Sequence, residues 1–389
     1  MSKNKGVRAT LVNLWERTIT VLRGKGENIY LNGDNNLYAD EVEAVINNSP
    51  TSLRSANMMA KFIAGDGVYL GDDLNVINYN ELPIINRKKN YKITDIIEMA
   101  ARSISRHKGA WFHVIYGIDE DGKVVPVGLD VLNYLRPRLS KEDTEENQGK
   151  IYVRDSWNNK NIFEKVNDKQ WFYPFNPNQD VLLAQIKTDN DGEITDLAEA
   201  IKDYRGQIYY LNLTPEYIYA QSPLHAAYND ADTEGRISIY ANKQSRDGFL
   251  GKTVVVAQGL DDEEEEKEFN KNLKSFLGPE ESSELFVMRV DTTDDLDNVL
   301  KVIQLKPQFD DKLFEVTDKR VLRNIFGAFN NIPPALVVAG DGALFGTSGD
   351  TYTEMKKFYS EQTQEEREKL ERALYYMGFP YKIKPIVDA

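Results

Sequence analysis

"RNIFGAFNNIPPALVVAGDGALFGTSGDTYTEM", residues 323–355, places a polar, glycine-rich segment between two stretches with helical character. The first stretch stops at Pro333-Pro334, because proline lacks the amide proton that a helix interior needs. Glycines then recur at 340, 342, 346 and 349, with Asp341 and Asp350 among them. A segment of this kind either cradles a phosphate or moves against a large ligand.

The phosphate-cradle alternative fails on charge. "GDGALFGTSGD" contains no lysine, and its aspartates would repel a phosphate. A second candidate, "RDGFLGKT", ends like a phosphate-binding loop but has Arg246 where that motif requires glycine, and a strand pattern follows it. We therefore interpret "VVAGDGALFGTSGD", residues 337–350, as a loop that changes shape and adheres weakly.

Long helices are predicted on both sides of this segment. Ser222 suits an N-cap and Pro223 a first helical position, so a helix of about seven turns is expected up to Phe249. A second helix is expected over about 309–326. A third is expected from Thr351 to about Met377, with Thr351 and Glu354 at capping-box spacing.

A small acidic module separates the first two long helices. "KTVVVA" and "ELFVMRV" are strand patterns, and the run between them predicts a helix with Phe269, Leu273 and Phe276 on one face. Residues 261–290 hold ten acidic and four basic residues, a net charge of −6. Acidic residues in the first turn of that helix suit its dipole.

The N-terminal part of the chain mixes helix and strand signals, which predicts an α+β fold. A helix is expected to begin at Ser49-Pro50-Thr51 and to stop at Gly65-Asp66-Gly67, and another to run from an N-cap at Thr94 to Ile104. "GAWFHVIYGIDEDGKVVPVGLDVL" predicts a hairpin with a turn at Asp121-Gly122. Between about 140 and 195, "KIYVRDSW" and "VLLAQIKT" are isolated strand signals.

Composition limits the possible functions. The 389 residues are 41% hydrophobic and 28% charged, as in globular proteins, and carry a formal net charge of −14. Such a surface does not favour general binding to nucleic acid. The chain has no cysteine, no apolar run of about 18 residues and three scattered histidines, so we expect no thiol chemistry, membrane span, cofactor or metal centre. Asp119 with Asp121, like Asp341 with Asp350, is interpreted as a turn pair.

Basic residues recur along the two long helices at helical spacing. They are Arg236, Lys243 and Arg246 on the first helix, and Lys312, Lys319 and Arg323 on the second. One interpretation is a solvated face or a set of salt bridges between neighbouring copies. The other is a partial lining that faces DNA.

Taken in order, these segments resemble the portal proteins of tailed bacteriophages of the long-tailed type. The resemblance rests on three stretches: "HKGAWFHVIYGIDEDGKVVPVGLDVLNYLRPRL", "IYYLNLTPEYIYAQSPLHAAYNDADTEGRISIYANKQSRDGF" and "DKRVLRNIFGAFNNIPPALVV". In the last, Ile325, Phe326, Gly327, Pro333 and Pro334 match the family's helix end. The chain departs from the family pattern at Ala220-Gln221 and in the "AFNN" spacer.

The resemblance implies a ring subunit with an α/β wing, a long-helix stem, a small β-α-β clip, a tunnel loop and a short or absent crown. The implied parts are the wing at 1–221, the stem helices at 222–250 and 308–329, the clip at 251–307, the tunnel loop at 330–350, a C-terminal wing helix at 351–380 and a short crown or tail at 381–389. The implied tunnel-loop residues are Gly340, Asp341, Gly342, Phe345, Gly346, Thr347, Ser348 and Gly349. The implied docking residues on the clip are Glu263, Glu264, Glu265, Glu266, Glu280 and Glu281.

The implied function is a non-enzymatic conduit at one capsid vertex of the virion, assembled in the host cytoplasm. Twelve copies would surround double-stranded DNA during packaging and ejection. The implied partners are the terminase large subunit, the major capsid protein and the head-tail connector, with no membrane. The alternative is a capsid or tail-connector subunit that does not conduct DNA, and a nucleotide hydrolase is a more distant third.

Overall fold

The computed structural model describes residues 29–71, 75–141, 149–157, 171–190, 192, 194, 196–247, 254–258, 286–290, 311–338 and 349–386. They form a mixed α+β fold, as the sequence predicts. The chain divides into two compact units, one of Met1–Gly235 with Asp318–Ala389 and one of Arg236–Thr317. The chain therefore leaves the first unit once and returns to it once.

A six-stranded sheet forms the centre of the first unit. Its strands are β4 (Gly109–Ile118), β5 (Val124–Leu132), β6 (Pro137–Leu139), β7 (Ile151–Val153), β8 (Trp171–Pro174) and β9 (Gln207–Asn212). Their order is β5-β4-β9-β8-β7-β6, and only the pair β8-β9 is parallel. β4 and β5 are the predicted hairpin, and its turn places Gly122 at φ +76°, where a side chain would be strained.

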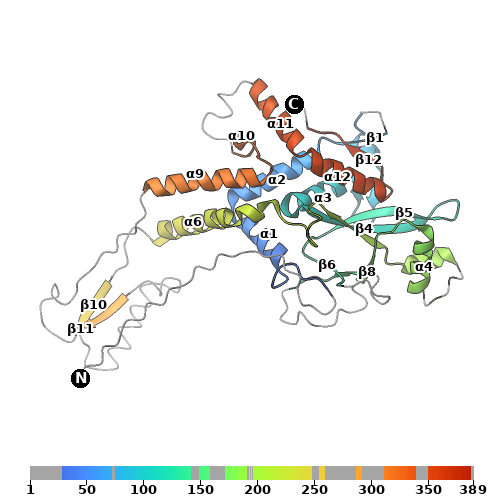
Figure 1. Ribbon diagram of the computed structural model, residues 1–389, viewed down its shortest axis with the longest axis horizontal. Coiled ribbons are helices and arrows are strands. Elements are labelled where there is room, and N and C mark those ends of the chain that lie inside the picture. The colour runs from blue at the N-terminus through green and yellow to red at the C-terminus, as the bar shows by residue number, and fades with distance from the viewer. Residues whose placement is uncertain are drawn as a thin grey trace. The chain divides into compact units, whose positions relative to one another are not determined.

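Helices cover one part of this sheet and build the main core (Figure 1). α3 (Ile93–His107) packs on β4 and β5, α2 (Pro50–Ala64) packs on α3, and α1 (Tyr38–Asn48) and α12 (Gln364–Tyr376) pack on α2. The predicted caps of α2 are confirmed. Ser49 accepts a hydrogen bond from Ser52 N at its start, and Gly65 at φ 73° ends it.

Short elements complete the first unit. β1 (Val68–Leu70) pairs with β12 (Tyr381–Ile383), and β2 (Ile84–Asn86) pairs with β3 (Tyr91–Lys92). The first unit also contains the 3₁₀ helix η1 (Tyr79–Glu81), α4 (Gln179–Asp189) and α5 (Leu197–Asp203). The pairing of β1 with β12 joins segments more than 300 residues apart in the chain.

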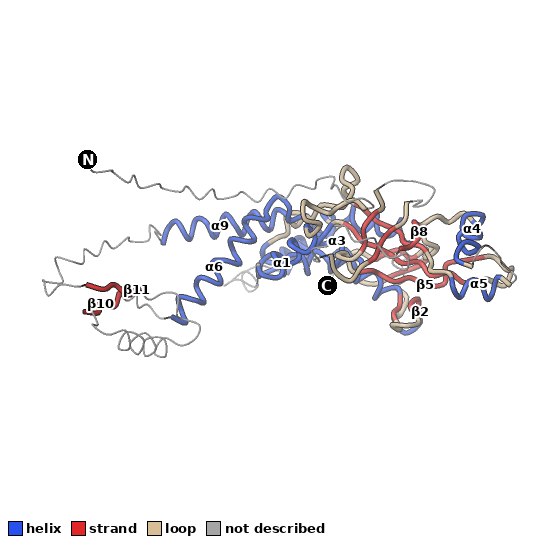
Figure 2. Tube along the Cα trace, turned by 90° about the horizontal axis from the view of Figure 1, so that it is seen from below, coloured by secondary structure: helices blue, strands red, loops and turns tan. Residues whose placement is uncertain are grey.

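The remaining helices that the structure describes before and after β10 (Val254–Gln258) and β11 (Phe286–Val290) in the chain are η3 (Pro223–Ala227), α6 (Tyr228–Asp247), α9 (Asp311–Ala328), α10 (Pro334–Val337) and α11 (Gly349–Gln362). Ser222 is the predicted N-cap, and its Oγ accepts from Leu224 N at 3.2 Å. In the second unit, β10 and β11 form the two predicted strands, which Figure 2 shows in red. The two strands pair in parallel. The helix predicted between them lies outside the described residues.

Four local predictions are wrong. "VLLAQIKT" lies in helix α4, where Leu182, Gln185 and Ile186 share one buried face. α3 has Lys92, not Thr94, as its N-cap. The helix predicted from Ser222 starts as the 3₁₀ turn η3.

The fourth wrong prediction is the single helix over 351–377. It is two helices, α11 and α12, which meet at Thr363, whose Oγ1 donates to Tyr359 O at 3.1 Å. A threonine hydroxyl that bonds the carbonyl four residues back competes with regular helix geometry. Thr351 lies inside α11, which begins at Gly349, so it is not the first residue of the helix as predicted.

Candidate functional site

The helix α6 is attached to the first unit through polar groups. The Glu234 carboxylate accepts hydrogen bonds from the Ser49 hydroxyl, from Thr51 Oγ1 at 2.6 Å and from Thr51 N at 3.3 Å. These donors belong to the start of α2, where a negative charge also suits the helix dipole. A Cβ on Gly235 would lie 3.1 Å from Asn48 O, so α6 passes close to the end of α1.

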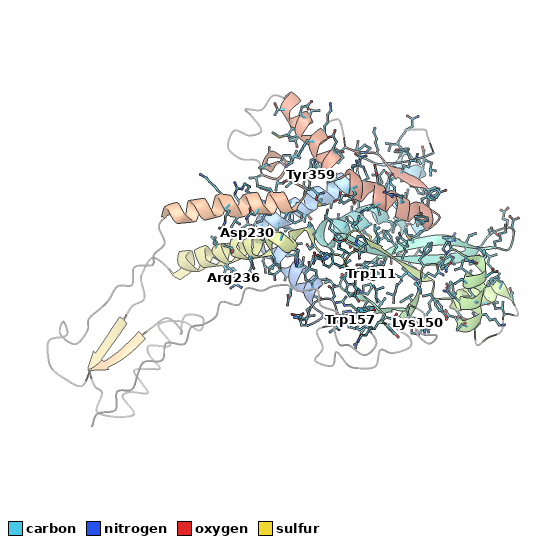
Figure 3. The ribbon with its side chains drawn as sticks, viewed as in Figure 1. Trp111, Lys150, Trp157, Asp230, Arg236 and Tyr359 are labelled. Carbon is cyan, nitrogen blue, oxygen red and sulfur yellow. The ribbon has the colours of Figure 1, made fainter. Side chains whose placement is uncertain are left out.

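The helix α9 is attached mainly through apolar side chains. Val321, Ile325 and Phe329 recur every four residues and are at most 1% exposed. This spacing places Val321 and Ile325 on one face of the helix and Phe329, which directly follows the helix, in line with them against the core. One polar contact joins the two long helices, since Asn324 Nδ2 donates to Asp230 Oδ2 at 3.0 Å. Figure 3 marks Asp230 on α6.

The opposite face of α9 is cationic and exposed. Lys319, Arg320 and Arg323 are all exposed. Lys319 and Arg323 border a hollow of about 400 Å³, whose apolar wall includes Leu322, Phe326 and Ile332. The arrangement offers positive charge at a rim and an apolar floor. It can attract an anionic surface by electrostatics.

A buried polar cluster fixes the chain where α9 ends. Asn330 and Asn331 adopt φ of 57° and 52°, a left-handed conformation that asparagine tolerates well. Asn330 Nδ2 donates to Glu366 Oε1 at 2.9 Å and to Gln362 O at 2.9 Å. Lys108 Nζ donates to the same Glu366 oxygen and, at 3.3 Å, to Asn330 Oδ1. α9, α3 and α12 are thereby joined at one point.

Tyr359 anchors α11 to the same region (Figure 3). Its side chain is fully buried, packs edge to face on Phe62 and donates from its hydroxyl to Phe329 O at 3.0 Å. Burial raises the pKa of Tyr359, and the nearby Glu366 carboxylate raises it further. The segments on both sides of residues 339–348 are therefore held to one core.

The structure brings together only part of the predicted basic stripe. Lys319 and Arg323 line the same hollow, and Arg236 is exposed on α6 in the second unit. Lys243, Arg246 and Lys312 lie on described helices, but their side chains are outside the described residues. Sequence reasoning missed Arg320, although it lies three residues from Arg323. It also missed the Lys108–Asn330–Glu366 cluster, for which the Asn330-Asn331 pair before two prolines is the available signal.

Apart from Gly349, the predicted tunnel-loop residues and the predicted clip docking residues lie outside the described part of the chain. Gly340 to Ser348 lie outside the described residues, and Gly349 is the first residue of α11. Glu263 to Glu266, Glu280 and Glu281 also lie outside them. The tunnel-loop and clip assignments therefore stay predictions.

The three histidines have structural contacts, and they do not form one cluster. His107 stacks on Tyr134 with ring centroids 4.4 Å apart, His113 Nε2 lies 2.7 Å from Arg205 O, and His225 Nδ1 lies 3.3 Å from the Tyr38 hydroxyl. Burial lowers the pKa of His113 and of His225. In the part of the chain that the structure describes, no group of three or more His, Asp or Glu residues is placed to hold a metal.

No described helix is both long enough and apolar enough to span a bilayer.

Comparison with known proteins finds similarity only among solved structures. No model of a known protein family matches the chain. No curated protein sequence matches it either. Among the similar structures are chains of gene transfer agent (GTA) particles. A chain of the virion of the native particle is 14% identical with a TM-score of 0.45, and covers 90% of this chain and 84% of that chain.

Two further similar chains come from the necks of such particles. One, from the neck of the native particle computed with C12 symmetry, is 13% identical with a TM-score of 0.43. The other, from the neck of the empty particle computed with C6 symmetry, is 16% identical with a TM-score of 0.44. Each covers 90% of this chain and 84% of the other. At these values the similarity by itself assigns no function to the chain.

Proposed function

We propose that this protein is a structural subunit of a phage-type virion, and specifically a portal subunit that assembles into a ring around double-stranded DNA. In this role it is not an enzyme and needs no cofactor. The ring conducts DNA during packaging and ejection, and it docks the packaging motor, the capsid and the head-tail connector. The observation that carries the proposal is the pair of long helices, α6 and α9, which contact each other where they join one α+β unit.

The attachment of these helices suits a wall that resists force. α6 is fixed by the Glu234 hydrogen bonds, and α9 by its apolar face and the Asn330 cluster. Buried apolar contacts are close-packed and transmit strain rather than absorb it. The attached ends of these helices therefore resist displacement when a stiff polymer slides past them.

The charge distribution suits a channel that does not grip its cargo. Each phosphate that a Lys or Arg neutralises adds salt-sensitive affinity, so a dense basic lining would hold DNA in place. This chain carries a formal net charge of −14, and the exposed cations in the described part of α9 are Lys319, Arg320 and Arg323. A few cations on a repulsive background attract a duplex without immobilising it.

The first test is assembly. The purified full chain should form closed rings, visible end on by electron microscopy and matching an integral number of chains by native mass spectrometry. A chain that stays monomeric at high concentration contradicts the portal proposal. Rings without a central opening wide enough for duplex DNA favour the connector or capsid alternative.

The second test separates conduction from assembly. The triple variant Lys312→Glu, Lys319→Glu, Arg323→Glu should still form rings, while particles that contain it should retain less DNA. The matched control reverses three exposed cations on α2 and α4, Arg54, Lys61 and Lys187, and should retain DNA normally. A triple variant that loses only assembly supports the alternative subunit.

The glycine segment gives a third test. Gly340→Pro, Gly342→Pro and Gly346→Pro should leave rings intact and impair DNA packaging or retention, because proline removes backbone freedom. Gly349→Pro serves as the control, since Gly349 is the first residue of α11, where proline is tolerated. Normal packaging by all of the first three variants contradicts a moving loop.

A further inference from the structure

A basic pocket lies in the first unit, at the opposite end of the β4–β5 hairpin from its turn. It has a volume of about 460 Å³ and is bordered by the end of α3, the end of β5 with the turn that follows, and the β2–β3 turn. Its cationic side chains are Lys89, Arg102, Arg106 and Arg136, and His107 also borders it. For a chain with a net charge of −14, this is a notable concentration of positive charge.

Two of these cations are neutralised within the pocket. Glu43 pairs with Arg106 and lies 3.5 Å from His107 Nε2. Burial alone would raise the pKa of Glu43, but the facing His107 and Arg106 outweigh it and lower that pKa, so the carboxylate stays ionised. Lys89 pairs with Asp130 at 2.8 Å.

The other two, Arg102 and Arg136, have only loose ion-pair partners among the described residues. Arg102 is 69% exposed and lies 3.9 Å from Glu98, which is itself 59% exposed. Arg136 is 47% exposed and lies 3.6 Å from Asp155, which is 94% exposed. Exposed pairs at these distances contribute little, so both guanidinium groups can exchange their partner for a better placed carboxylate.

The turn of the same hairpin carries the complementary charge. Glu120 and Asp121 are exposed there, next to Gly122, where an added Cβ would meet nothing within 4 Å. Asp119 is committed to the turn, since its carboxylate accepts from Lys123 N at 2.7 Å. With Lys123 included, residues 119–123 carry a net charge of −2 and project from the sheet.

The two charged ends are separated along the strands. The hairpin pairs Ile118 with Val124 beside the turn and Trp111 with Leu132 beside the pocket. Trp111 and Ile118 are seven residues apart in β4. An antiparallel strand rises by about 3.4 Å per residue, so the pocket end and the turn end of the hairpin are about 24 Å apart. The turn therefore cannot reach the pocket of its own chain, and the complementary contact is available only to a second copy.

We propose that the acidic hairpin turn of one copy docks in the basic pocket of the next, with Glu120 and Asp121 facing Arg102 and Arg136. This inference rests on the proposed function, because the contact is the one that closes the proposed ring. The turn and the pocket are different surfaces, so the contact is heterologous, and each copy uses both surfaces once in a closed ring. Opposite charges at the two ends also disfavour head-to-head pairing.

Cysteine pairs test the contact directly, because the natural chain contains no cysteine. The variant Asp121→Cys, Arg136→Cys should form disulfides between copies on mild oxidation, giving a ladder of covalent multimers up to the size of the ring. A disulfide needs Cα atoms within about 7 Å, which excludes bonding within one chain. The control, Glu361→Cys with Arg136→Cys, places one thiol on an exposed position of α11 and should give no ladder.

Charge reversal gives the energetic test. Glu120→Lys with Asp121→Lys, or Arg102→Glu with Arg136→Glu, should each raise the concentration needed for assembly by about tenfold or more. Combining all four should restore assembly, whereas Glu354→Lys with Glu361→Lys on α11 should have no effect. Circular dichroism of each variant establishes that the fold is retained.

The outcomes separate this contact from the ring itself. A ladder that stops at the dimer, or rings that form normally with either reversed pair, overturns the docking but leaves the portal proposal standing. A wild-type chain that forms no ring overturns both. If Arg102→Glu with Arg136→Glu abolishes binding to a 20-base-pair duplex and leaves assembly unchanged, the pocket binds phosphates and the docking is wrong.

Discussion

The two long helices join the same unit by different physical means. α9 buries an apolar face of Val321, Ile325 and Phe329, whereas α6 presents a carboxylate, Glu234, to the start of α2. Apolar burial is strong and has no preferred direction, while hydrogen bonds are weaker and fix geometry. We infer that the α9 attachment supplies most of the stability and that the α6 attachment sets the position of its helix.

The largest expected effect is at the apolar attachment. Phe329→Ala should lower the free energy of unfolding by about 3–5 kcal/mol, because it removes a fully buried ring and leaves a cavity. Urea denaturation measures the loss. The matched control is Phe358→Ala on α11, where the ring is 44% exposed and the expected change is much smaller. Equal losses at the two positions contradict the assignment of stability to the α9 face.

The next effect is at the polar cluster where α9 ends. Glu366→Ala leaves the Lys108 ammonium and the Asn330 amide without their shared acceptor, in a site where Lys108 is 16% exposed. Breaking a pair of this kind costs about 3 kcal/mol. Lys108→Met with Glu366→Met removes both charges and should cost less than the sum of the single changes. A double-mutant cycle measures the coupling, and strict additivity contradicts it.

The local signals of the long helices were readable in the sequence. Helix ends are marked by backbone chemistry that acts over a few residues, here at Ser222-Pro223 and at Pro333-Pro334. In the structure, a helical element starts at each of these two sites. The β4–β5 hairpin was readable for the same reason, because Asp121-Gly122 suits a tight turn. Short-range rules predict such features well.

The contacts that attach the two long helices to the first unit could not be predicted from the sequence. Glu234 bonds residues about 180 positions earlier, and Lys108 bonds Glu366 from 258 positions away. No spacing rule connects such partners, because the fold alone brings them together. The strand predicted at "VLLAQIKT" failed similarly, since Leu182 and Ile186 satisfy a helical face that becomes apparent only when the core is known.

The α6 attachment is expected to show a smaller effect. Glu234→Ala removes the acceptor for the Ser49 hydroxyl and for Thr51, and should cost about 1–2 kcal/mol, the range for loss of a helix cap. Glu234→Gln keeps an acceptor but not the charge, so it should cost less. Thermal unfolding of both variants measures the difference. A loss as large as that of Phe329→Ala would remove the distinction between the two attachments.

The smallest expected loss of stability at neutral pH is at Tyr359, whose hydroxyl donates a hydrogen bond to the backbone of Phe329 at the α9 attachment. Tyr359→Phe keeps the buried ring and loses the hydrogen bond to Phe329 O, which costs about 1 kcal/mol. Burial raises the pKa of Tyr359 above the value near 10 of an unfolded tyrosine. A raised pKa means that the folded state keeps a proton that the unfolded state loses, so this stability is complete below pH 10 and falls as the pH rises further.

Phenylalanine has no such proton, so the two unfolding curves should converge above pH 10. The difference in unfolding free energy should shrink by about 1.4 kcal/mol per pH unit, and the curves should cross within about one unit. Other buried tyrosines, such as Tyr38 and Tyr219, are present in both proteins and cancel in the difference. Tyr375→Phe is the control, because Tyr375 is 69% exposed and should leave the alkaline slope unchanged. A difference in unfolding free energy between wild type and Tyr359→Phe that stays constant from pH 9.5 to pH 11 would show that the Tyr359 hydroxyl reaches solvent. The α9 attachment would then be less tightly packed than its buried apolar face indicates.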